Sequence, residues 1–138
     1  MKTFVVSAVS IVLVSIFFCP MVMAAPSMPA DLQIVQPDPS LPKELSGFFG
    51  KWEGSSSGIM IEYFLIVEKI DEEKASVYLW RGSSVAEQFK GWERYEAKVI
   101  KDRGKYKLLF RARQLTLKGE YLDYYYPAEG SSRLTRAR

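Results

Sequence analysis

Apolar and polar residues alternate with a period of two through most of the chain after Gly47, and the clearest stretch is IMIEYFLIVEKI, residues 59–70. A period of two places alternate side chains on opposite faces of a strand. One face carries Ile61, Tyr63, Leu65 and Val67. The other carries Met60, Glu62, Phe64, Ile66 and Glu68. This pattern predicts a strand with one buried face and one mixed outer face.

A second stretch, KYKLLFRAR at residues 105–113, alternates still more regularly. Its apolar face consists of Tyr106, Leu108, Phe110 and Ala112. Its basic face consists of Lys105, Lys107, Arg111 and Arg113. Such a division is typical of a half-solvated antiparallel strand.

Shorter β-rich runs fill most of the remaining chain after Gly47. They are ASVYLW, RYEAKVI, QLTLKGEYLDYYY with a break in phase near Gly119, and SSRLTRAR. Polar turns, DEEK and DRG, separate some of them. Only SSVAEQFK looks helical, because Ser84 and Glu87 match a capping box ahead of Gly91. We therefore expect an all-β fold, a small antiparallel up-and-down barrel of about seven or eight strands with at most one short helix, or else a small sandwich.

The N-terminus has the order of a secretory signal: Lys2, a long apolar run, and a small-residue exit. We expect residues 1–24 to be a signal peptide cleaved after Ala24, a periplasmic or secreted location, and no stable membrane span after cleavage. Two alternatives are retention as a membrane anchor, since the run approaches the length of a span, and lipidation at Cys19. Phe18, where lipoboxes have a small residue, and Pro20 argue against them.

Residues 25–46 contain a run of prolines, which favour extended backbone and predict a semi-rigid linker ending in a short turn at Pro42 to Leu45. The predicted β-barrel domain then spans residues 47–138. The chain beyond Ala24 has no cysteine. It therefore depends on its core rather than on disulfides.

The segment LSGFFGKWEGSSSG resembles the opening of calycin-type barrels, the lipocalins and avidins, in which a glycine precedes a tryptophan on the first strand. That resemblance implies that Trp52 packs near the closed end of a barrel. The longer pattern, FFGKWEG followed by LIVEKI, VYLW, GWERYEAKV and LTR, also resembles small uncharacterised modules of secreted bacterial proteins. Avidins hold biotin with asparagine among other residues, and this chain contains none, which argues against biotin.

Composition removes several enzyme classes. The chain has no histidine, which excludes a Ser-His-Asp triad, a Cys-His dyad and a histidine-ligated metal site. GSSSG matches a nucleophile elbow around Ser56, but a predicted strand follows it rather than the required helix. We expect no enzymatic activity, no cofactor and no metal site.

Charge is unevenly distributed along the chain. Residues 25–102 hold nine Lys or Arg against thirteen acids, whereas residues 103–138 hold nine against three. A basic face on the last strands would attract an anionic glycan, a lipid or an acidic protein. The predicted export argues against nucleic acid. The candidate partner-binding residues are Lys105, Lys107, Arg111, Arg113, Tyr124 and Tyr125.

Two functions remain for an exported, non-enzymatic module. In the first, a solid barrel binds its partner through the basic strands. In the second, a lipocalin-like container holds a small apolar or amphipathic ligand inside. Its lining would be Trp52, Tyr63, Trp80, Tyr95, Tyr106 and Phe110. The two differ in whether the barrel interior is filled or hollow, which the sequence leaves open.

Overall fold

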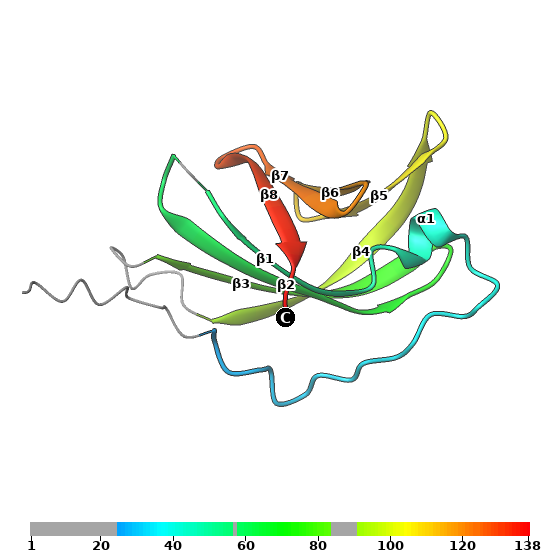
Figure 1. The fold of residues 1–138 in the computed structure, drawn as a ribbon, viewed down its shortest axis with the longest axis horizontal. Helices are drawn as coiled ribbons and strands as arrows, with labels where there is room; N and C mark the ends of the chain where they lie inside the picture. The colour runs from blue at the N-terminus through cyan, green and yellow to red at the C-terminus, as the bar shows by residue number, and fades with distance from the viewer. Residues whose placement is uncertain (1–24, 57, 84–90) are drawn as a thin grey trace, which may run out of the picture.

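The computed structural model describes residues 25–56, 58–83 and 91–138, and they form a closed antiparallel barrel (Figure 1). Its elements are α1 (Lys43–Ser46), β1 (Gly50–Ser55), β2 (Ile61–Ile70), β3 (Lys74–Ser83), β4 (Trp92–Asp102), β5 (Lys105–Phe110), β6 (Arg113–Lys118), β7 (Tyr121–Tyr126) and β8 (Gly130–Arg136). Each strand pairs with the next in sequence, and β1 pairs with β8. The predicted all-β, up-and-down barrel is confirmed. The helix predicted at SSVAEQFK falls on residues 84–90, outside the described residues.

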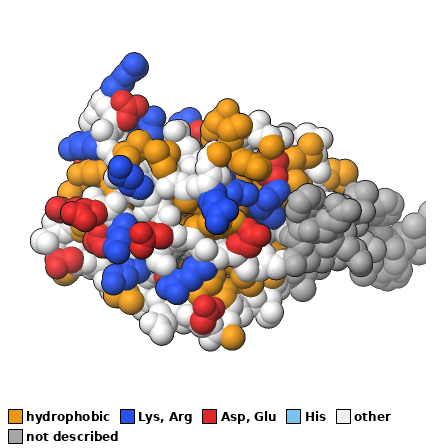
Figure 2. Space-filling model, turned by 180° about the vertical axis from the view of Figure 1, so that it is seen from behind, with side chains coloured by type: hydrophobic (Ala, Val, Ile, Leu, Met, Phe, Trp, Pro, Cys, Tyr) orange, Lys and Arg blue, Asp and Glu red, His pale blue; other side chains and the backbone are white. Residues whose placement is uncertain are grey.

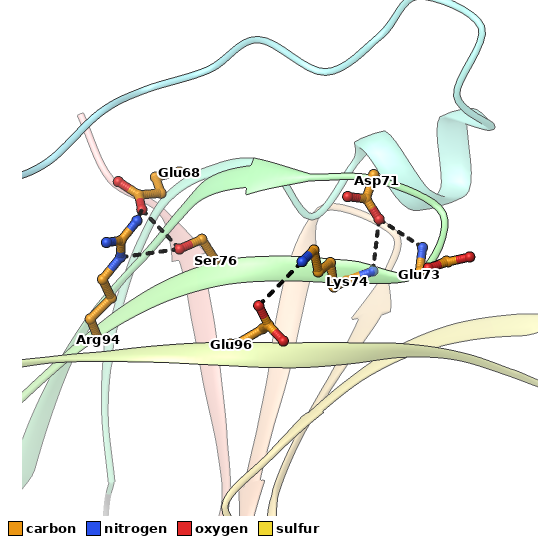
Figure 3. Close-up of polar contacts among 7 residues, drawn as sticks. All are labelled: Glu68, Asp71, Glu73, Lys74, Ser76, Arg94 and Glu96. Atoms are coloured by element: carbon orange, nitrogen blue, oxygen red, sulfur yellow. Dashed lines mark hydrogen bonds and ion pairs between the residues drawn. The ribbon is translucent and has the colours of Figure 1, made fainter.

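The period of two is realised most clearly in β2. Ile61, Tyr63, Leu65 and Val67 are buried and belong to the barrel core. The pairing of β2 with β3 shifts between Val67 and Lys69, which is a β-bulge. The turn that follows is held by Asp71, whose carboxylate accepts hydrogen bonds from the backbone N–H groups of Glu73 and Lys74 at 2.8 Å each (Figure 3).

One end of the barrel is closed by the segment that leads into β1. Leu41, Leu45 and Phe48, from and around α1, join the hydrophobic core. Trp52 lies beneath them, only 1% exposed, and its indole Nε1 donates to the carbonyl oxygen of Phe48 at 2.9 Å. The guanidinium of Arg136 covers the indole at 3.8 Å from the ring centroid. The motif GFFGKWEG therefore begins the barrel and seals this end.

One predicted strand proves to be two. The stretch at residues 105–113 is interrupted by a two-residue turn at Arg111 and Ala112, which have φ values of 44° and 60°. Positive φ at both central positions is the geometry of a type I′ hairpin. The turn changes the phase of the alternation, so the prediction that Arg113 lies on the solvated face is wrong. Arg113 is 7% exposed and points into the barrel.

The proline-rich segment that precedes α1 runs along the outside of the barrel wall (Figure 1). The backbone N–H of Val35 donates to the carbonyl oxygen of Glu68 at 2.8 Å, and that of Gln33 donates to the Glu68 carboxylate at 2.9 Å. The indole of Trp92 donates to the carbonyl oxygen of Ser27 at 2.7 Å. These bonds hold the segment against β2 and β4.

Glu68 is the buried anchor of this outer wall. Its carboxylate is 1% exposed and accepts hydrogen bonds from Ser76 at 2.8 Å and from the guanidinium of Arg94 at 2.5 Å (Figure 3). Burial acts to raise its pKa, but the hydrogen bonds from Gln33, Ser76 and Arg94 outweigh burial and lower the pKa below its usual range. Glu68 is therefore ionised at neutral pH and depends on these partners.

Candidate functional site at the barrel mouth

The barrel end opposite α1 carries a polar and aromatic group of side chains, which we call the mouth cluster. It lies where β1 meets β2, β5 meets β6 and β7 meets β8. Its members are Tyr63, Arg81, Tyr95, Arg113, Tyr124, Tyr126 and Glu129. Two buried or largely buried arginines in so small a barrel need a specific explanation, because charged groups avoid the interior unless they are paired.

Arg81 and Glu129 form the ion pair of the cluster. A terminal guanidinium nitrogen of Arg81 contacts Oε1 of Glu129, and the two side chains are 16% and 7% exposed. The hydroxyl of Tyr63 donates to Oε2 of the same carboxylate at 2.7 Å. Both oxygens of Glu129 are thus engaged, which compensates for taking the carboxylate out of water.

Arg113 is held differently, by tyrosines and backbone. Its Nε donates to the hydroxyl of Tyr124 at 3.0 Å, and a terminal nitrogen donates to the carbonyl oxygen of Arg111 at 3.3 Å. The guanidinium lies 4.3 Å from the ring centroid of Tyr126 and 5.5 Å from that of Tyr95. Within the described ranges, no ion pair involves Arg113. Its charge is therefore stabilised by ring faces and dipoles rather than by a carboxylate.

The ionisation of the cluster reflects this environment. Burial, together with the nearby Glu129, raises the pKa of Tyr63 well above its ordinary value. Burial also raises the pKa of Tyr124 to about 12, although the charge and hydrogen bond of Arg113 act in the opposite direction. For Arg113, burial acts to lower the pKa, but the interactions with Tyr124 and Tyr95 outweigh it and raise the pKa. At neutral pH both tyrosines are neutral and Arg113 is a cation.

Tyr63 and Tyr124 form the floor of the mouth. Their ring centroids are 4.8 Å apart, and both residues are fully buried. The same hydrophobic core contains six leucines with 0–1% exposure: Leu65, Leu79, Leu108, Leu115, Leu122 and Leu134. Among these core residues, the side chains that can donate or accept hydrogen bonds to a ligand are therefore those of the mouth, not the leucines.

The predicted ligand-lining residues lie in three different parts of the barrel: the mouth, the region away from the mouth, and the outer wall. Tyr63, Tyr95 and Phe110 gather at the mouth, where the rings of Tyr95 and Phe110 are 5.1 Å apart. Trp52 lies at the sealed end, and Tyr106, stacked beneath Lys101 at 5.0 Å, also lies away from the mouth.

The prediction that Trp80 lines the barrel interior is wrong. It pairs with Phe64 across β2 and β3, on the face opposite Leu65 and Leu79, and the two rings meet edge to face at 5.4 Å on the outer wall. Both faces of β3 are apolar, so alternation alone does not reveal which one is inside.

The predicted partner-binding residues do not form one surface. Lys105 and Arg111 are exposed but lie at opposite ends of β5, and Lys107 forms an ion pair with Asp102 at 3.0 Å. Tyr125 is exposed, whereas Tyr124 and Arg113 are buried, which corrects their expected outward position. On the face shown in Figure 2, basic and acidic side chains are interspersed. The structure instead brings Arg113 and Tyr124 together with Tyr63, Tyr95 and Phe110.

Sequence reasoning missed three members of the mouth cluster. Arg81 follows an apolar run and reads as a strand end, and Glu129 lies in the turn PAEG, where an acid ordinarily faces water. Tyr126 is the last of three consecutive tyrosines, and such a run has no alternation that indicates which of them faces inward. Arg81 does share the phase of Val77 and Leu79, which is the one signal that would have placed it inside.

Neither a metal site, nor a membrane-spanning helix, nor a similarity to known proteins assigns a function to the described part of the chain. Among the residues that the structure describes, no group of three or more Asp, Glu, Cys or His side chains is placed to hold a metal ion. The same part of the chain has no helix of the length and apolarity needed to cross a bilayer. Searches against family models, curated proteins and solved structures found no match for this chain.

Proposed function

We propose that this protein is an exported, non-enzymatic binding module that takes the anionic group of a small amphipathic ligand at the barrel mouth. The observation that carries the proposal is the buried Arg113, whose charge meets no carboxylate in the described part of the chain. This function combines the two hypotheses from the sequence. The ligand is anionic, as in the first hypothesis, but it binds inside the end of the barrel, as in the second.

The chemistry of Arg113 suits a carboxylate. A guanidinium has five N–H donors in a planar fork that matches a carboxylate or a related oxyanion. The described hydrogen bonds of Arg113 use Nε and one terminal nitrogen. We propose that the other N–H donors bind an incoming anion, which would supply the missing negative charge.

Aromatic rings around Arg113 provide the apolar part of the proposed site. Tyr126 and Tyr95 lie on the guanidinium, and Phe110 packs against Tyr95. The Tyr63–Tyr124 floor and the leucine core below it keep the ligand shallow. We therefore infer a ligand with one anionic group and a short apolar body. The calycin-type resemblance, which we also offer as a proposal, agrees with a ligand site at the open end of a barrel.

Native mass spectrometry of the protein purified from its own cells tests this function. Wild type should carry an extra mass that is lost on denaturation and corresponds to an organic acid. Arg113→Met, which keeps the length of the side chain without its charge, should carry none. Arg111→Met is the matched control, because Arg111 lies two residues away but is exposed on the turn. Equal ligand occupancy in the Arg113 and Arg111 variants, or a bare wild type, would contradict the proposal.

A further inference from the structure

A second concave surface lies at the sealed end of the barrel, away from the mouth cluster. It is a groove of about 820 Å³, open to solvent, between α1, the β6–β7 turn and β8. We call it the basic groove. Its charged and aromatic lining consists of Lys43, Trp52, Glu120, Tyr121, Arg133 and Arg136, and Leu117 is its aliphatic side chain.

The basic groove has an excess of positive charge. Lys43, Arg133 and Arg136 face one acid, Glu120. In the described portion of the chain, none of these three cations takes part in an ion pair. The neighbouring acid Asp123 is instead paired with Lys118 at 2.9 Å. Three cations from two elements therefore line one solvent-filled space.

Two of the three cations are held in place. Arg136 donates to the carbonyl oxygens of Gly47 and Phe49 while it stacks on Trp52. Arg133 lies over the ring of Tyr121, 4.1 Å from its centroid. Guanidinium groups fixed by stacking lose less side-chain freedom when an anion binds. The groove is thus preorganised for oxyanions.

We propose that the basic groove binds an acidic polysaccharide, a sugar chain that carries carboxylate or sulfate groups. Fixed guanidinium groups match such oxyanions, and the Tyr121 ring beside Arg133 offers a face for a sugar ring. The groove is open, which admits a chain that continues past it. Its short aliphatic lining argues against the acyl chain of a lipid. Because it lies at the opposite end from Arg113, this site is independent of the ligand proposed for the mouth.

Binding of a fluorescent heparin hexasaccharide, measured by anisotropy, tests this inference. The double variant Lys43→Gln and Arg133→Gln should weaken binding at least about tenfold, since two of three charge-assisted contacts are lost. Arg136 is left intact because it also covers Trp52. The control, Lys98→Gln and Arg111→Gln, removes the same charge from exposed positions elsewhere and should bind as wild type does. Arg113→Met should also bind normally, which separates this site from the mouth.

Three outcomes would overturn the proposal. Equal weakening in the groove variant and in the charge-matched control would mean that only net charge matters. No saturable binding of the hexasaccharide by wild type would mean that the groove does not take such a chain. Tighter binding of a single-stranded oligonucleotide with the same number of charges would assign the groove to another polyanion. Near-ultraviolet circular dichroism of each variant confirms that the barrel is intact before binding is compared.

Discussion

Replacing Trp52 by alanine should remove the seal at the α1 end of the barrel. Trp52 is 1% exposed, and its indole contributes packing, the 2.9 Å hydrogen bond to Phe48 and the surface on which Arg136 stacks. The change leaves a cavity beneath α1 and an acceptor without its donor.

The size of the effect follows from these contacts. Truncating a buried tryptophan to alanine costs about 3 to 5 kcal/mol through lost transfer free energy and the remaining cavity. Losing the stacking of an exposed arginine adds about 0.5 to 1 kcal/mol. Because a small domain has a free energy of unfolding of only about 5 to 15 kcal/mol, the variant should be marginally stable.

Urea denaturation followed by far-ultraviolet circular dichroism measures this loss. With a slope of about 1.5 kcal/mol per molar urea, the midpoint should fall by roughly 2 to 4 M. Trp80→Ala is the matched control, since Trp80 lies partly exposed on the outer wall and should cost about 1 kcal/mol. If the two variants lose the same stability, or if Trp52→Ala loses less than about 1 kcal/mol, the assignment of Trp52 as the seal is refuted.

Three further predictions concern barrel closure and pH. Gly54→Ala should destabilise the fold by about 1 to 3 kcal/mol, because the added Cβ overlaps the carbonyl oxygen of Arg133 where β1 meets β8. The control Gly58→Ala, at a position with open space around it, should change the urea midpoint little, and equal effects of the two variants would refute the close approach at Gly54. Stability should fall as pH rises above about 10, because the folded-state pKa values of Tyr63 and Tyr124 are raised above the unfolded value and the unfolded state therefore loses protons first. The urea midpoints at about pH 9 and about pH 11 should differ less in Tyr124→Phe than in wild type, and an equal difference in the two proteins would contradict this. Stability should also fall as pH drops below about 4.5, because Glu68, whose folded-state pKa is lowered, then becomes protonated. The urea midpoint should depend less on pH in this acid range in Glu68→Gln than in wild type, and identical pH profiles would show that Glu68 contributes nothing to the acid dependence.

The fold could be predicted from the sequence because alternation with a period of two is strong in most strands. β2 and β8 lie where the pattern indicates, and the turn at Arg103 and Gly104 follows the DRG signal with positive φ at both residues. The barrel closure itself follows from sequential hairpins whose apolar faces require a common core. Local physics and global topology agree in these elements.

The site could not be predicted to the same extent, and the turn at Arg111 and Ala112 is the main reason. Two-residue hairpin turns are ordinarily recognised in a sequence by Asn, Asp or Gly, and this turn contains none of the three. Missing it reversed the face assigned to Arg113, so a member of the mouth cluster was predicted as an exposed basic residue. The predicted position of Trp80 was wrong for a different reason. Trp80 and Leu79 are both apolar although they lie on opposite faces of the barrel wall, so the sequence pattern does not show which one is inside.

The central claim, that the barrel mouth binds an anionic amphipathic ligand through Arg113, is tested most directly by nuclear magnetic resonance. In a titration with octanoate, the side-chain Nε–Hε signal of Arg113 and the ring signals of Tyr95 and Tyr126 should shift together and saturate. The signals of Arg111 and Lys105, which are exposed, should stay in place. Saturating shifts confined to the mouth cluster are the result that the account predicts. Shifts that are spread over exposed cations, or an Arg113 signal that does not respond, would contradict it.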